Sequence, residues 1–116
     1  MQLTLLKSKI HRATVTDANL NYEGSITVCP KLCDAAHIRP FEKVDIYNCN
    51  NGQRFSTYVI LGKEGDMCLN GAAARLVQPG DLIILACFVQ MSEEEAAAHK
   101  PRLVFVDSKN AVAHIT

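Results

Sequence analysis

Gly24 and Ser25 stand side by side in the stretch YEGSIT, residues 22–27, where a loop enters a strand-like segment. A serine hydroxyl held against the preceding carbonyl can attack it, which converts the peptide bond into an ester. Loss of that ester by elimination leaves dehydroalanine, and hydrolysis then gives a pyruvoyl group on a new N-terminus. The reaction needs a strained bond, and we expect glycine at position 24 to permit one. Gly-Ser pairs are common in loops, so the dipeptide alone is a weak signal.

Four other side chains are suited to binding a small dianionic substrate. Lys9 and His11 occupy positions i and i+2, which share one face of a strand. Arg54 can hold a carboxylate through two hydrogen bonds, and Tyr58 lies on the same strand face as Arg54. Each type is also common as a solvated charge or a half-buried aromatic, so each residue taken singly has an ordinary structural explanation.

Other catalytic and metal-binding patterns are absent from the sequence. Cys29, Cys33 and His37 follow at a spacing that could place them on one helix face, but structural zinc usually needs a second ligand pair, which the chain lacks. No serine lies in a G-x-S-x-G elbow, and there is no P-loop or G-x-G-x-x-G. We therefore expect no metal, and we interpret Cys29 and Cys33 as packing residues. The remaining cysteines give no functional signal: Cys49, Cys68 and Cys87.

The composition predicts one globular domain over residues 1–116. With 48% hydrophobic and 21% charged residues, the chain can fold without disulfides or a metal. Its 12 Lys and Arg balance 12 Asp and Glu, and zero net charge argues against a general electrostatic affinity for nucleic acid or anionic membranes. We expect no secretory signal and no membrane helix, since no apolar run approaches ~20 residues. An odd number of cysteines then favours reduced thiols in the cytoplasm.

Short strands joined by tight turns dominate the predicted secondary structure. The Asn51-Gly52 pair predicts a hairpin, and Ser92 to Glu95 forms a capping-box pattern that opens a short helix. The polar tail after Asp107 is expected to fray. The pattern predicts a mainly β domain, a compact barrel or sandwich with short helices. The expected strands are 44–48, 54–61, 67–69, 82–89 and 102–107, and further short helices are expected at 31–36, after Pro30, and at 72–76.

Four stretches, taken together and in this order, resemble the pyruvoyl-dependent aspartate 1-decarboxylase family. They are LKSKIHRATVTDANLNYEGSIT at 6–27, NGQRFSTYVI at 51–60, NGAAAR at 70–75 and PGDLIIL at 79–85. The resemblance runs from residue 1 to residue 107 or so. It implies a small double-psi β-barrel assembled as a homotetramer; neither the psi topology nor the tetramer follows from the strand pattern.

The resemblance also implies a role for each matching residue. Gly24-Ser25 is the bond that the precursor cuts by itself, giving chains 1–24 and 25–116, of 24 and 92 residues, the second beginning with a pyruvoyl group made from Ser25. Thr57 stabilises the oxyanion during processing and contacts substrate, and Tyr58 is the proton donor. The other matches shape the cleavage site (Asn70), meet the substrate carboxylates (Lys9, Arg54) or line the pocket with backbone (Gly71, Ala72, Ala73).

The implied activity is decarboxylation of L-aspartate to β-alanine and CO2, which supplies pantothenate and coenzyme A synthesis. The substrate amine condenses with the pyruvoyl ketone to form a Schiff base, a covalent electron sink that takes the part of pyridoxal phosphate. Neither a metal nor pyridoxal phosphate is implied. Some members mature with a helper protein, and whether this chain needs such a partner is left open.

Two features complicate the match. Tyr47 stands where some members have tryptophan, and Thr57 faces away from Arg54 and Tyr58 if their strand is regular. A site between subunits would allow Arg54, Thr57 and Tyr58 all to contribute, because one chain could supply one face of the strand and a neighbouring chain the other. Two other functions stay open: a non-catalytic β-barrel that binds or regulates, and a pyruvoyl decarboxylase for another amino acid.

Overall fold

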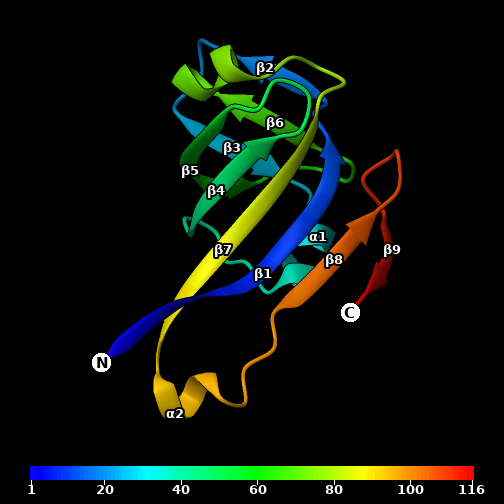
Figure 1. Cartoon of the computed structure of the whole chain (residues 1–116). Helices are drawn as coiled ribbons and strands as arrows, with labels where there is room; N and C mark the ends of the chain where they lie inside the picture. The colour runs from blue at the N-terminus through cyan, green and yellow to red at the C-terminus, as the bar shows by residue number, and fades with distance from the viewer.

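The two longest strands, β1 (Gln2–Thr14) and β7 (Leu82–Ser92), pair antiparallel and run side by side through the molecule (Figure 1). In the computed structural model, which describes residues 1–116, β1 also pairs in parallel with β8 (Arg102–Val106). On its far side β7 pairs with β4 (Lys43–Asn48), which forms the predicted hairpin with β5 (Arg54–Leu61). β1 therefore lies inside the sheet, bonded on both edges.

Nine strands form one continuous sheet in the order β2-β6-β3-β5-β4-β7-β1-β8-β9. The prediction of a mainly β domain with short helices is confirmed, whereas the double-psi topology and the tetramer stay predictions. The elements not yet introduced are β2 (Asp17–Asn19), β3 (Ser25–Val28), α1 (Pro30–Ala36), β6 (Met67–Asn70), the 3-10 helix η1 (Gly71–Leu76), α2 (Glu93–Ala96) and β9 (Val112–Ile115).

Alternate side chains of most strands meet in a single hydrophobic core of 20 buried residues. In the part of the sheet formed by β6, β3 and β5, the inward residues Leu69, Ile26 and Val59 are each fully buried. Because successive strand residues point to opposite faces, the residues between them lie on the outer face. That outer face carries the polar side chains of the candidate site.

The local patterns that predicted element ends are largely confirmed. β5 spans the expected residues 54–61, Pro30 begins α1, and the capping box at Ser92 is formed with Glu95. The expectation of a frayed tail is wrong, because residues 112–115 form β9 against β8. Asn110 ties this hairpin down through hydrogen bonds to the backbone of Thr14 and to the Gly65 carbonyl.

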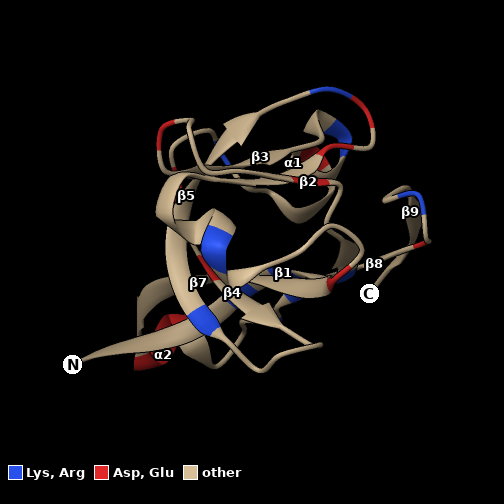
Figure 2. Cartoon of the chain, turned by 90° about the horizontal axis from the view of Figure 1, so that it is seen from above, with Lys and Arg blue, Asp and Glu red and all other residues tan.

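Charged residues of both signs are interspersed over the molecule in the view of Figure 2, in agreement with the zero net charge. Lys7 pairs with Glu42 at 2.6 Å, and Lys31 pairs with Glu64 at 3.0 Å. None of the helices has both the length and the apolar character that a bilayer crossing demands.

Candidate active site

Four polar side chains form a square on the outer face of β3 and β6. The antiparallel register pairs Ser25 with Asn70 and Thr27 with Cys68. Residues two apart in a strand share a face, so all four side chains project to the same side. The register thus brings Ser25 and Asn70, which are 45 positions apart in the chain, into direct contact.

The Ser25 hydroxyl is buried and held from two directions. Its side chain donates a hydrogen bond to the Glu23 carbonyl oxygen at 3.1 Å and accepts one from Asn70 Nδ2 at 3.0 Å. The second Asn70 amide hydrogen goes to Thr27 Oγ1 at 2.9 Å. Ser25 is only 1% exposed, while Gly24 beside it is exposed. The nucleophile predicted from the sequence is therefore fixed in place, at the point where an exposed loop enters a strand.

The conformational strain expected at Gly24 is found at Gly71 instead. Gly24 is not among the residues with positive φ, and a Cβ built on it would meet nothing within 4 Å. Gly71 has φ +67°, and a Cβ there would lie 2.6 Å from Gly24 Cα and 2.8 Å from Gly24 N. The expectation for Gly24 is corrected on this point: glycine is required at position 71, because its backbone packs directly on the residue before Ser25.

The side chains of Thr57 and Tyr58 point to opposite faces of β5, as the alternation predicted. Exposed and less exposed residues alternate along the strand, with Arg54 and Tyr58 outside and Thr57 on the inner side. The parallel register pairs Ile26 with Val59, so Ser25 lies level with Tyr58 on the outer face. If the register continues by one more residue toward the start of both strands, Thr57 lies level with Gly24.

The predicted substrate cations lie further along the same outer face. Arg54 is cross-strand partner to Tyr47, and its guanidinium carbon sits 4.3 Å from the centre of the Tyr47 ring, a cation–π contact. Lys9 is three strands away, since it pairs with Ala86 of β7, which pairs in turn with Asp45 of β4. The backbones of Lys9 and β5 are therefore roughly 14 Å apart across the sheet. The two cations share a face but do not form a close pair within one chain.

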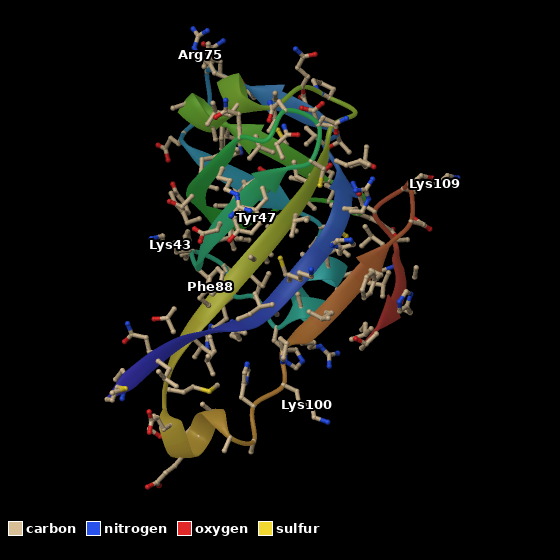
Figure 3. The ribbon with its side chains drawn as sticks, in the orientation of Figure 1. Lys43, Tyr47, Arg75, Phe88, Lys100 and Lys109 are labelled. Carbon is tan, nitrogen blue, oxygen red and sulfur yellow. The ribbon has the colours of Figure 1, made fainter.

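Sequence reasoning missed Lys43. It is the direct cross-strand partner of Tyr58 and an exposed cation on the outer face. Figure 3 shows Lys43, Tyr47 and Phe88 along β4 and β7, and Phe88 is 42% exposed. No local signal placed Lys43 there: a two-residue turn at Asn51-Gly52 would have paired Asp45 with Tyr58, whereas the observed hairpin has a longer loop and pairs Lys43 with Tyr58.

His11 lies on β1 near the C-terminal hairpin. Its ring meets Phe105 edge-on at 5.3 Å between centroids, and its Nδ1 is buried without a hydrogen-bond partner. Burial lowers the pKa of His11, and the nearby charges of Lys9 and Arg12 lower it further. The ring is therefore neutral at neutral pH, and His11 adds no positive charge to that of Lys9.

A cavity of about 290 Å³ opens over the outer face of β2, β6 and β3, next to Ser25. None of the five main cavities of the chain is lined by Lys9, Arg54 or Tyr58, and Ala72 and Ala73 of η1 line none of them either. No three His, Cys, Asp or Glu side chains gather as metal ligands. The residues lining the cavity beside Ser25 are Thr16, Asp17, Asn19, Tyr22, Thr27, Asp66, Cys68 and Asn70.

Comparison with known proteins identifies the family of this chain. Residues 1–113 match the family described as aspartate decarboxylase. The chain belongs to the aspartate decarboxylase family. Proteins named aspartate 1-decarboxylase are similar to it over almost their whole length. The one from Bdellovibrio bacteriovorus is 60% identical over 97% of this chain and 90% of its own length. The one from Syntrophus aciditrophicus is 59% identical over 98% of this chain and 100% of its own length. The relative from Clostridium kluyveri is 57% identical over 100% of this chain and 93% of its own length.

Membership of the aspartate decarboxylase family confirms the resemblance inferred from the four sequence stretches. Those stretches contain Ser25, Asn70 and Gly71, which lie in contact around the Gly24–Ser25 bond. They also contain Lys9, Arg54 and Tyr58, which are spread over the outer face of the sheet. The residues named by the resemblance thus form two groups, one around the Gly24–Ser25 bond and one across the outer face of the sheet.

Proposed function

We propose that this chain cuts its own Gly24–Ser25 bond and, in the resulting two-chain form, decarboxylates L-aspartate to β-alanine and CO2, which supplies pantothenate and coenzyme A synthesis. The observation that carries the proposal is the buried Ser25 hydroxyl, held between the Glu23 carbonyl and the Asn70 amide in a member of the aspartate decarboxylase family. The free cysteines are compatible with a cytoplasmic enzyme.

Self-cleavage begins with attack of Ser25 Oγ on the Gly24 carbonyl carbon. The C–O bond of the ester forms as the C–N bond breaks, and the proton lost by the hydroxyl passes to the amine that leaves. Asn70 Nδ2 lowers the cost of negative charge on Oγ while that proton departs. Thr57, level with Gly24 on the next strand, is the proposed donor to the carbonyl oxygen as it becomes an oxyanion. Elimination then frees the Gly24 carboxylate, and hydrolysis of the dehydroalanine consumes water and releases ammonia.

The surroundings of Ser25 fit a pyruvoyl group at this position. The Ser25 side chain is buried against Asn70, and the Asn70 amide can donate to a carbonyl oxygen where it now donates to Oγ. Once formed, the group supplies an electron sink for the bonding electrons of the departing carboxylate. The position of Tyr58, level with Ser25 on the same face, supports a role in returning a proton to the substrate carbon.

Substrate recognition is assigned to the cations of the outer face. Arg54, held against Tyr47, can bind one carboxylate through two parallel hydrogen bonds, and Lys9 can pair with another as a point charge. Neither side chain has a hydrogen-bonding partner within the chain, and no main cavity encloses them. The separation of Lys9 from β5, and the opposite directions of Thr57 and Tyr58, support a site completed between subunits of a homotetramer.

Trapping with borohydride tests the activity directly. Reduction in the presence of L-aspartate should attach the substrate to fragment 25–116 and abolish β-alanine formation. Label on fragment 1–24, or no label, would contradict the role given to Ser25, and an intact chain that never acts on aspartate would instead favour a non-catalytic binding module. Turnover of glutamate at the rate of aspartate would assign the chain to another substrate.

Tyr58→Phe separates turnover from self-cleavage. The variant should cut at Gly24–Ser25 at the wild-type rate, because Tyr58 makes no hydrogen bond with the Ser25 hydroxyl, but its kcat should fall about a hundredfold or more with the loss of the proton donor. Fragment masses measure the first rate, and β-alanine formation measures the second. Loss of cleavage in Tyr58→Phe would place Tyr58 in processing.

A further inference from the structure

The Asn70 amide has a third contact, on the side away from Ser25. Its Oδ1 accepts a hydrogen bond from Cys68 Sγ at 3.2 Å, while its Nδ2 donates to Ser25 and Thr27. The other acceptor near the thiol, the Leu69 carbonyl oxygen, is 3.8 Å away. All the hydrogen-bonding atoms of the Asn70 amide are thus satisfied by three neighbours on one face of β3 and β6.

The hydrogen bond from the Cys68 thiol bears on which end of the Asn70 amide faces Ser25. The Ser25 hydroxyl directs its own proton at the Glu23 carbonyl, so toward Asn70 it can only accept. A rotated amide would present Oδ1 to Ser25 Oγ and leave two acceptors facing each other. A protonated thiol on the opposite side favours the orientation with Nδ2 toward Ser25, because a thiol donor pairs with Oδ1 better than with an NH2 group.

Burial keeps this thiol in its donor form. Burial raises the pKa of Cys68, and the neighbouring Asp17 carboxylate raises it further. The sulfur therefore holds its proton at neutral pH. Cys68 is only partly buried, however, and with Asn70 and Thr27 it lines the cavity of about 290 Å³ beside the cleavage site.

We propose that Cys68 is a positioning residue for self-cleavage, acting through Asn70: its thiol holds the Asn70 amide in the orientation that donates to Ser25 Oγ. The inference rests on the proposed cleavage at Gly24–Ser25. It gives a role to a cysteine that the sequence pattern left without one, and it extends the cleavage machinery by one residue of β6.

The test measures the first-order rate of cleavage of freshly purified, uncut chain. Cys68→Ala removes the donor and should slow cleavage about tenfold, the effect of one lost hydrogen bond on a rate. Cys68→Ser keeps a hydroxyl donor and should retain at least half the wild-type rate. Cys68→Val, of similar size but without a donor, should match the alanine variant. Cys49→Ala is the control, since Cys49 is exposed in a turn.

A double-mutant cycle separates positioning from a general effect on folding. Asn70→Ala should itself slow cleavage, and Cys68→Ala added to it should slow cleavage no further, because the thiol acts only through Asn70. Equal slowing by Cys68→Ala in both backgrounds, wild-type cleavage by Cys68→Ala, or failure of serine to restore the rate would each overturn the inference while leaving the cleavage itself established. A wild-type chain that is never cut would overturn the proposed function and this inference together.

Discussion

Ser25→Ala is expected to remain a single chain of 116 residues and to form no β-alanine from aspartate. The alanine lacks the oxygen that attacks the Gly24 carbonyl, and no other hydroxyl occupies its place between Glu23 and Asn70. Because the same side chain is the source of the pyruvoyl group, loss of cleavage and loss of activity should be complete and simultaneous. Intact-mass spectrometry after prolonged incubation measures the first, and product analysis measures the second.

Ser8→Ala provides the matched control for this variant. Ser8 is another fully buried serine, in β1, and its Oγ has no hydrogen-bond partner. Removing it should leave two fragments that meet between residues 24 and 25. A wild-type chain that stays intact on incubation, or Ser25→Ala protein that is cut at the same bond, would overturn the assignment of Ser25.

Gly71→Ala should slow self-cleavage by about a hundredfold or more, without preventing the fold. A Cβ at this position would lie 2.6 Å from Gly24 Cα, a distance that real contacts do not show, so Gly24 must move away from its place before Ser25. An alanine at φ +67° adds a backbone cost of about 1–2 kcal/mol. A displacement of the reacting carbonyl by even 1 Å is of the order that costs a hundredfold in rate.

Gly52→Ala distinguishes displacement from backbone strain. Gly52 has a similar φ of +76°, but a Cβ there would meet nothing within 4 Å. Both variants should lose similar stability in thermal unfolding from the backbone alone, with a further loss in Gly71→Ala from the contact. Only Gly71→Ala should be slow to cleave. Equal cleavage rates for the two variants would show that the contact between Gly71 and Gly24 has no part in processing.

Local signals predicted the elements of this fold well, because short-range physics decides them. The Asn51-Gly52 pair correctly predicted a hairpin between β4 and β5, and the alternation of Arg54, Thr57 and Tyr58 correctly predicted their opposite faces. The strand at the C-terminus was missed because the β8–β9 hairpin is held by hydrogen bonds from Asn110 to the backbone of Thr14 and Gly65. These residues are far apart in the chain, so no local sequence pattern indicates the strand.

The contacts around Ser25 depend on non-local register and could not be predicted from the chain alone. The pairing of β3 with β6 places Asn70 beside Ser25 and Cys68 beside Thr27, and a shift by one residue would turn each side chain to the other face. The same register explains why glycine is needed at position 71: the turn after β6 passes directly over Gly24. The family resemblance identified Ser25, Asn70 and Gly71 as site residues, but the contacts among them are seen only in the folded structure.

The position of β1 within the sheet means that a cleaved chain would consist of two peptides held together by strand pairing. Residues 1–24 contain the longest strand, and after cleavage that strand would be a separate peptide bonded to β7 on one edge and to β8 on the other. Folding of the precursor is unimolecular, whereas renaturation of the matured enzyme would require two chains to find each other. Refolding of the single protomer should therefore depend on concentration for the matured form and not for the precursor, and the small fragment would be a structural subunit retained by the sheet.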